Sequence, residues 1–284
     1  MFFPNSVGAD DCFKSEVDEL LNDARSNGDN ALSSPIDIAM IQQCVNSLKP
    51  RKAAGPDELC NEHIMLGGVQ LSVHLCLLFN AMLKHSFVPS AFHCGVIIPL
   101  LKNKHGDASR LDMYRGITLS VVVSQLFELA LLSIYGDSLT SDNLQFGFKK
   151  DSSCSHALFT LGKTVKYFTK RGSKIHCISY DATKAFDKVL HHGLLLKMLR
   201  RGIPVTFVRI LRKWYSNLIC SVSWNCILSE SFAVKCGVRQ GGGAVTIYLF
   251  ALYVDDLIKL LRYSGFGVYI TNIFAGCIFY ADAC

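Results

Sequence analysis

The stretch KIHCISYDATKAFD, residues 174–187, decides the expected fold. Its first half, residues 174–180, is β-like, and Asp181 stands where such a strand would end. A carboxylate at a strand end, followed by a turn into a helix, is well placed to hold a metal ion, because the strand fixes the oxygen and the turn keeps the site open. Asp181 could instead cap a helix that begins near Lys184, and on these residues alone the cap is the better interpretation.

A second aspartate follows an apolar run in FYAD, residues 279–282. Enzymes that transfer nucleotides use carboxylates to hold two Mg²⁺ ions about 3.5–4 Å apart. Mg²⁺ takes one or two carboxylates together with substrate phosphates, so only a few protein ligands are expected. Asp181 and Asp282 together therefore define a candidate two-metal site, which neither residue indicates alone.

The segment YVDD, residues 253–256, also places an aromatic residue before paired aspartates. Its surroundings differ, because Leu249, Leu252 and Leu260 recur at helical spacing. We therefore expect Asp255 and Asp256 to lie in the middle of a helix, partly solvated and without a catalytic role.

A run of glycines in GVRQGGG, residues 237–243, is the third candidate feature. Glycines let a backbone approach a nucleotide or template closely, and Arg239 and Gln240 can donate hydrogen bonds to it. A plain flexible turn is the alternative interpretation of such a run.

The rest of the chain mixes helices and strands without a βαβ repeat, which predicts an α+β fold. Residues 1–32 are acidic and polar and suggest a tether, after which Ser34 is placed to cap a helix with Pro35 in its first turn. The pattern predicts further helices at residues 71–83, 117–132, 155–168, 189–200, 206–218 and 248–262. It predicts strands at residues 94–101, 174–180, 222–228, 232–237, 267–270 and 277–280.

The composition narrows the class of protein. Half of the 284 residues are hydrophobic, which excludes a disordered chain, and the net charge of +6 favours a polyanionic partner only weakly. The twelve cysteines form no CxxC pair and the first residues do not resemble a secretory signal, so we expect reduced thiols, no disulfide partner and a cytoplasmic or nuclear location. The most apolar stretch, residues 117–135, contains Gln125 and Glu128, so no membrane span is expected.

Eight segments occur in the order found in the reverse transcriptases of non-LTR (LINE-type) retrotransposons, which this chain resembles. The three central ones are DATKAFD, GVRQGG and YAD, which resemble motifs A, B and C of that family. In chain order, the eight are residues 52–57 with Glu62, residues 98–102, residues 114–119 with Glu128, residues 145–148 with Ser153 and Ala157, residues 181–187, residues 237–242, residues 248–258 and residues 280–282.

The resemblance implies a right-hand polymerase with fingers at residues 33–175 and a palm at residues 176–284, the end of the palm and the thumb being absent. It implies an RNA template, a DNA primer, deoxynucleoside triphosphates and two Mg²⁺ ions as partners and cofactors. The roles it implies are metal ligation for Asp181 and Asp282, nucleotide binding for Lys102, Arg115, Phe186, Gln240 and Gly241, and template or primer contact for Arg239 and Tyr280. Phe186 would pack where a ribose 2′-hydroxyl would clash.

Three features depart from the family pattern. Ala283 stands where the family has a second aspartate, and the sequence ends one residue later. Gly116 replaces a proline that usually follows Arg115, which is expected to loosen that loop, and residues 243–247 carry a one-residue insertion. We therefore expect an RNA-directed DNA polymerase domain that is inactive as it stands. The alternatives are a non-catalytic nucleic-acid-binding remnant and, as a third interpretation, an intron-encoded maturase.

Overall fold

The computed structural model describes residues 7–26, 35–103, 105–149, 151–182, 184–239 and 243–281. The chain divides into two compact units. The first unit comprises Met1–Ser138 and Phe186–Thr246, and the second comprises Leu139–Ala185 and Ile247–Cys284.

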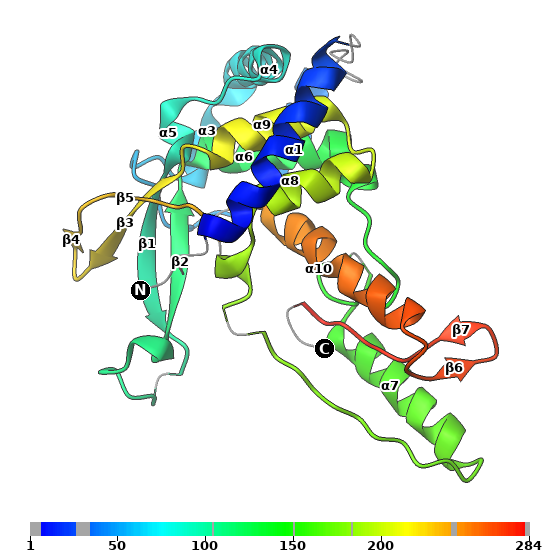
Figure 1. Cartoon of the computed structure of the whole chain (residues 1–284). Helices are drawn as coiled ribbons and strands as arrows, with labels where there is room; N and C mark the ends of the chain where they lie inside the picture. The colour runs from blue at the N-terminus through cyan, green and yellow to red at the C-terminus, as the bar shows by residue number, and fades with distance from the viewer. Residues whose placement is uncertain are drawn as a thin grey trace. The chain divides into compact units, whose positions relative to one another are not determined.

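Helices and a mixed sheet make up the first unit (Figure 1). The helices are α1 (Val7–Ser26), α2 (Ile38–Ser47), α3 (Asn61–Leu66), α4 (Gly68–His85), α5 (Ser90–His93), α6 (Val122–Tyr135), α8 (His191–Arg200) and α9 (Val205–Tyr215). The strands are β1 (Cys94–Leu101), β2 (Tyr114–Ser120), β3 (Ile219–Trp224), β4 (Ile227–Leu228) and β5 (Phe232–Ala233). Short 3-10 turns lie at η1 (Leu111–Met113), η2 (Gly136–Ser138) and η3 (Phe186–Lys188).

The sheet joins segments that are far apart in the sequence. Strand β1 pairs antiparallel with β2 and parallel with β3, and β3 pairs antiparallel with β4 and β5. The presence of both pairing directions, with helices packed beside them, confirms the predicted α+β class.

Aromatic side chains from four segments fill the core of the first unit. Phe127 of α6 lies 4.9 Å from Phe79 and 5.8 Å from Trp214, measured between ring centroids, and Phe92 lies 5.9 Å from Trp214. Burial of such large side chains removes the most apolar area per residue, so this cluster ties α4, α5, α6 and α9 together.

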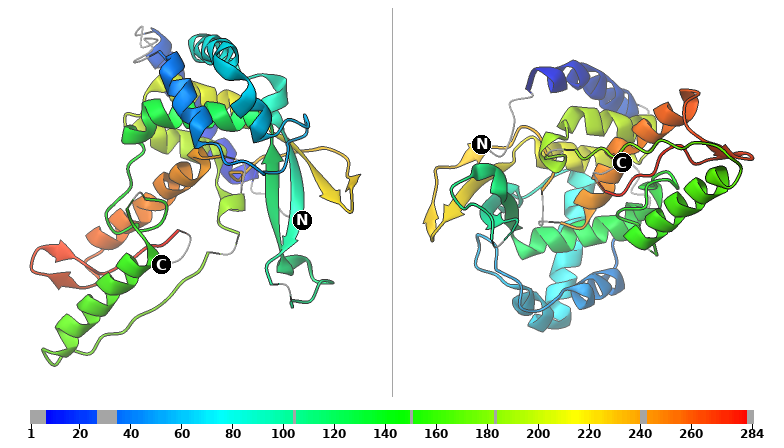
Figure 2. Two further views of the ribbon diagram at one scale, coloured as in Figure 1. Left: turned by 180° about the vertical axis from the view of Figure 1, so that it is seen from behind. Right: turned by 90° about the horizontal axis from the view of Figure 1, so that it is seen from below.

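Helix α1 occupies the segment for which the sequence suggested a tether, and it packs on α8 and α9 (Figure 1). Val17 and Leu21 are buried, while Glu16 forms an ion pair with Arg200 at 2.7 Å and Asp18 forms one with Arg212. The sequence did not predict this packing. The acidic residues resembled a solvated segment, because the cations that face them lie about 180 residues further along the chain. Helix α2 packs on α4 and α6, on the side of the first unit that the left view of Figure 2 shows.

Two local predictions in the first unit are corrected. Residues 117–120 belong to β2 and not to the helix predicted at residues 117–132, because they pair with residues 95–98 of β1. The cap of α2 is Asp37, whose carboxylate accepts a hydrogen bond from the Met40 N–H at 2.7 Å, and Ser34 lies outside the described residues. Gly116 was expected to loosen a loop, because it replaces a proline. It lies instead inside β2, paired with Pro99 of β1.

The second unit contains α7 (Cys154–Thr169), most of α10 (Val245–Tyr263) and the hairpin of β6 (Tyr269–Ile270) and β7 (Ile273–Phe274). Its core cluster consists of Ile258, Phe274, Cys277 and Phe279, with Leu144 packed against it.

The strand predicted at residues 174–180 is not formed. These residues have irregular backbone, and Ile178 and Tyr180 are 72% and 68% exposed. A strand requires a neighbour for its N–H and C=O groups, and a β-like composition cannot supply one. Within the strand predicted at residues 277–280, Phe279 forms a parallel bridge with Gln145, and Tyr280 is also a bridge residue.

Among the described residues, no helix combines the length and apolar character required to cross a membrane. The eleven cysteines in the described ranges are free thiols.

Candidate functional site

The start of the glycine-rich loop, residues 237–243, is attached to η3 in the first unit. The Gly237 N–H donates to the Val189 carbonyl at 2.7 Å, and the Val238 N–H donates to the Phe186 carbonyl at 2.9 Å. The backbone at residues 186–189 and the start of the glycine-rich loop are therefore joined by hydrogen bonds, although about fifty residues separate them in the sequence.

Gly237 has two physical reasons to be glycine. Its φ of +90° lies in the region that side chains disfavour, and a Cβ there would lie 3.0 Å from the backbone of Asp187. The buried His191 adds a further attachment, since its Nε2 donates to the Gly237 carbonyl at 2.7 Å. Burial lowers the pKa of His191, so the ring is neutral near pH 7 and its proton sits on Nε2.

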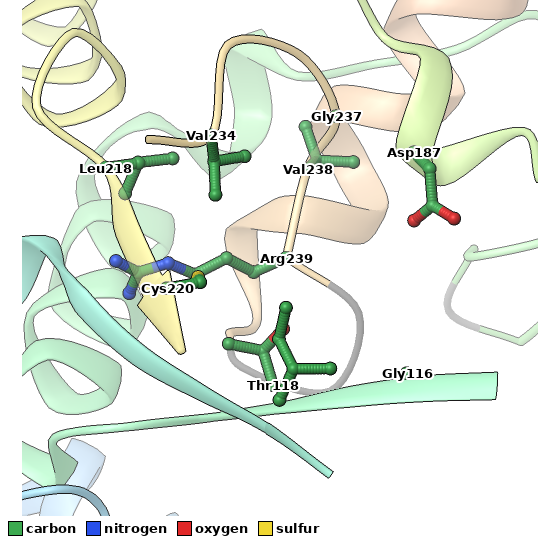
Figure 3. Close-up of a pocket in the computed structure, with 10 residues that line it drawn as sticks. Gly116, Thr118, Asp187, Leu218, Cys220, Val234, Gly237, Val238 and Arg239 are labelled. Carbon is green, nitrogen blue, oxygen red and sulfur yellow. The ribbon is translucent and has the colours of Figure 1, made fainter. Parts of the chain in front are cut away.

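A small pocket lies beneath this junction, lined by residues of β1, β2, β3 and the start of the glycine-rich loop (Figure 3). Its volume of about 20 Å³ accommodates roughly one water molecule, so it is the packed base of the loop and not a nucleotide site. Asp187 lies on one side of the pocket, and the Arg239 side chain extends away from it, beside Cys220 (Figure 3).

Arg239, predicted to contact template or primer, is buried and 8% exposed. Its Nη2 donates to the Phe92 carbonyl at 2.7 Å, and its guanidinium lies 5.9 Å from the centroid of the Trp214 ring. Burial lowers its pKa, with the charge of Glu128 acting in the opposite direction. In this position the guanidinium is not accessible to a nucleic acid.

The β1–β2 hairpin brings Lys102 and Arg115 together. Arg115 pairs across the sheet with Leu100, and the Lys102 N–H donates to the Met113 carbonyl at 2.9 Å. Both side chains are exposed, and the Lys102 ammonium donates to the Asp112 carbonyl at 2.9 Å. Two neighbouring cations on an exposed hairpin can bind a polyphosphate.

In the second unit, Gln145 holds the segment that precedes Asp282. The Gln145 side chain is fully buried, its Oε1 accepts from the Ala281 N–H at 3.2 Å, and its Nε2 donates to the Ala281 carbonyl at 3.3 Å. The neighbouring backbones add two bonds of 2.8 Å, from Phe146 N to Phe279 O and from Phe279 N to Leu144 O. A Cβ on Gly147 would lie 2.2 Å from the Ala281 nitrogen, so this glycine permits the close approach.

Asp181 is exposed and lies in the second unit. Among the described residues, no cluster of three or more His, Cys, Asp or Glu side chains could hold a metal ion. The donor chemistry nevertheless fits Mg²⁺, which needs only one or two carboxylates when substrate phosphates complete its shell. Asp282, Gln240 and Gly241, three of the predicted site residues, lie outside the described residues.

The remaining predicted residues have clear positions. Tyr280 is 40% exposed and follows the Phe279 bridge, and Phe186 is half-buried in η3. Asp255 and Asp256 lie within α10, as predicted, but Asp255 is buried and not partly solvated, because it accepts the Asp142 N–H at 2.5 Å.

Sequence reasoning assigned no role to His191 or Gln145. The available signal was a polar amide between the apolar residues Leu144 and Phe146, and a histidine pair at the start of a predicted helix. Both patterns are common at the surface, so their buried contacts could not be anticipated from the chain alone.

Residues 102–282, more than half of the chain, match the family described as reverse transcriptase (RNA-dependent DNA polymerase). The chain belongs to this family.

The relatives identify the retrotransposon type. The chain is 25% identical over 227 residues to the probable RNA-directed DNA polymerase from transposon BS of Drosophila melanogaster, covering 78% of this chain and 25% of the relative. It is 27% identical over 232 residues to the RNA-directed DNA polymerase from mobile element jockey of Drosophila funebris, covering 79% and 25%. These are polymerases of non-LTR retrotransposons, which confirms the resemblance, and the chain spans about a quarter of their length.

Proposed function

We propose that this chain is the polymerase part of a retrotransposon reverse transcriptase, which adds deoxynucleotides to a primer 3′-hydroxyl on an RNA template. The observation that carries the proposal is the family match over residues 102–282, a range that includes Lys102 and both candidate metal ligands. The fingers at residues 33–175 and the palm at residues 176–284 are the division that this function would use.

The proposed chemistry is two-metal nucleotidyl transfer. Asp181 and Asp282 would hold two Mg²⁺ ions. When bound, these ions would activate the primer 3′-hydroxyl and stabilise the leaving pyrophosphate. Lys102 and Arg115 support this assignment because they form an exposed cationic pair that can bind the triphosphate by charge-assisted hydrogen bonds.

Further contacts are proposed around the nucleotide. Phe186 would exclude the ribose 2′-hydroxyl, and Gln240 and Gly241 would contact the nucleotide and template. Tyr280, which is 40% exposed, would contact the template or the primer. The basic residues on both sides of Asp181 would bind the backbone of an RNA–DNA hybrid without regard to sequence, in a manner weakened by salt.

Ala283 sets the expected rate. It stands where the family has its second aspartate, so the metal site would have one carboxylate fewer than in the family pattern. We expect primer extension by the unmodified chain to be at or below detection, and far slower than by a site with both aspartates, because a ligand set that misplaces the metal by about 1 Å can cost on the order of 100-fold.

One observation favours a second candidate, a nucleic-acid-binding remnant without catalysis. Residues 174–180, which were expected to deliver Asp181 from a strand, have irregular backbone and are largely exposed. A remnant would keep the cationic surfaces and bind hybrid, but its metal site would not assemble.

The test is Mg²⁺-dependent extension of oligo(dT) on poly(A), comparing the purified chain with Asp181→Ala. Slow extension that Asp181→Ala removes supports the polymerase. Salt-sensitive binding of the hybrid, with no extension by either protein and with both shown to be folded by circular dichroism, supports the remnant.

A further inference from the structure

Glu128 of α6 lies against the far end of the glycine-rich loop. Its side chain is buried, and its Oε2 accepts a hydrogen bond from the Val245 N–H, the first residue of α10, at 3.1 Å. The same carboxylate fills the space beside Gly243, where a Cβ would lie 1.7 Å from Oε2. Glu128 therefore contacts the chain both at the last loop residue and at the helix start behind it.

The near end of the loop carries the opposite charge. Arg239 is buried, and its Nε and Nη1 have no hydrogen-bond partner among the described residues, while Nη2 is bound to Phe92. Glu128 and Arg239 both line one cavity of about 10 Å³, together with Tyr215. A buried guanidinium with two unpaired N–H groups needs a nearby negative charge, and Glu128 is the acidic residue that lines this cavity.

Several titratable groups share this region. The charges of Glu128 and Arg239 both act on the pKa of Tyr215. The charge of Arg239 also acts on the pKa of Cys220 and of His93, and Cys94 interacts electrostatically with Arg239. Burial raises the pKa of Glu128 to about 7, with the Arg239 charge and the Val245 N–H opposing it. The charge of this carboxyl therefore changes within the neutral pH range and not near its usual pKa of 4.5.

We infer that Glu128 is a positioning residue for the glycine-rich loop, which it fastens at Gly243 and Val245 while its charge balances Arg239 at the other end. The loop contains Gln240 and Gly241, which are proposed to contact the nucleotide. The effect of Glu128 on catalysis therefore rests on the proposed function. The fastening itself can be measured without catalysis.

The first experiment follows amide hydrogen exchange at Val245 between pH 6 and pH 8, corrected for intrinsic exchange rates. Because the pKa of Glu128 is higher in the closed state than in water, ionisation favours opening of this contact, and protection of Val245 should fall several-fold as the pH rises from 6 to 8. Glu128→Gln should show protection that does not change with pH, and Glu128→Ala should lose it. Glu19→Gln, on an exposed side chain, should behave as the unmodified chain.

Two results would overturn the inference: unchanged protection of Val245 in Glu128→Ala, or a pH-dependence that survives in Glu128→Gln. A second readout concerns catalysis in the Ala283→Asp chain, where Glu128→Gln should raise the KM for dTTP several-fold with little change in kcat. If extension is absent throughout but the exchange result stands, the proposed function fails and the positioning role does not. If extension proceeds and Val245 exchange is unaffected, the positioning role fails alone.

Discussion

At the residue scale, two glycines of the glycine-rich loop are required for different physical reasons. Gly237 is required by its positive φ and by the Asp187 backbone, whereas Gly243 is required by the carboxylate of Glu128. The sequence predicted a close backbone approach at this run. It could not separate an approach to a ligand from an approach to the protein's own Glu128, which is more than a hundred residues earlier in the chain.

Gly243→Ala should destabilise the chain by about 1–3 kcal/mol, because the new methyl group would displace a buried carboxylate that is bonded to Val245. Gly136→Ala is the matched control, since a Cβ there meets nothing within 4 Å and the backbone is helical. Urea unfolding of both variants measures the difference. Equal stability of the two variants would show that Glu128 does not occupy the space beside Gly243.

The pKa of Glu128 predicts a pH-dependence of stability. Its folded pKa of about 7 exceeds the usual 4.5, so the folded chain holds this proton more tightly than the unfolded chain. This proton binding contributes fully to the free energy of unfolding below about pH 4.5. The contribution declines as the pH rises to about 7 and is then constant, a total change of at most about 3 kcal/mol. Unfolding of Glu128→Gln across this window should show a shallower slope, and an identical slope would contradict the assignment.

At the scale of elements, the predictions succeeded where a pattern was long and local. Residues 94–101 form β1 as predicted, and the predicted helices at residues 71–83, 155–168 and 248–262 correspond to α4, α7 and α10. They failed where a partner decided the outcome. Residues 117–120 were assigned to a helix because an apolar run does not distinguish helix from strand, and pairing with β1 decided it.

Gln145 gives a prediction at the element scale, because it joins two segments of the second unit. Gln145→Ala removes both bonds to Ala281 and leaves the N–H groups of Ala281 and Gly147 without their acceptor, which should cost about 1–3 kcal/mol. Hydrogen exchange at Ala281 should accelerate by at least tenfold, whereas Gln70→Ala, on an exposed residue of α4, should leave it unchanged. Unaltered exchange in Gln145→Ala would mean that the amide does not hold this segment.

At the scale of the whole molecule, the order of motifs predicted the family correctly, because eight weak segments in one order are far more specific than any one of them. The contacts that build the site could not be predicted, since the bonds from Gln145 to Ala281 and from Glu128 to Val245 each join residues more than a hundred positions apart. The proposed catalytic chemistry depends on Asp181, Asp282 and the residue at position 283.

Primer extension by the Ala283→Asp chain tests the central claim most directly. The assay uses poly(A)–oligo(dT), dTTP and Mg²⁺, and compares the unmodified chain, Ala283→Asp, and Ala283→Asp combined with Asp181→Ala. We predict that the restored aspartate raises Mg²⁺-dependent extension by at least about tenfold and that Asp181→Ala removes it, since the site then loses a metal ligand. Extension that does not depend on Asp181, or hybrid binding with no extension by the folded Ala283→Asp chain, would contradict the assignment of this chain as a two-metal polymerase.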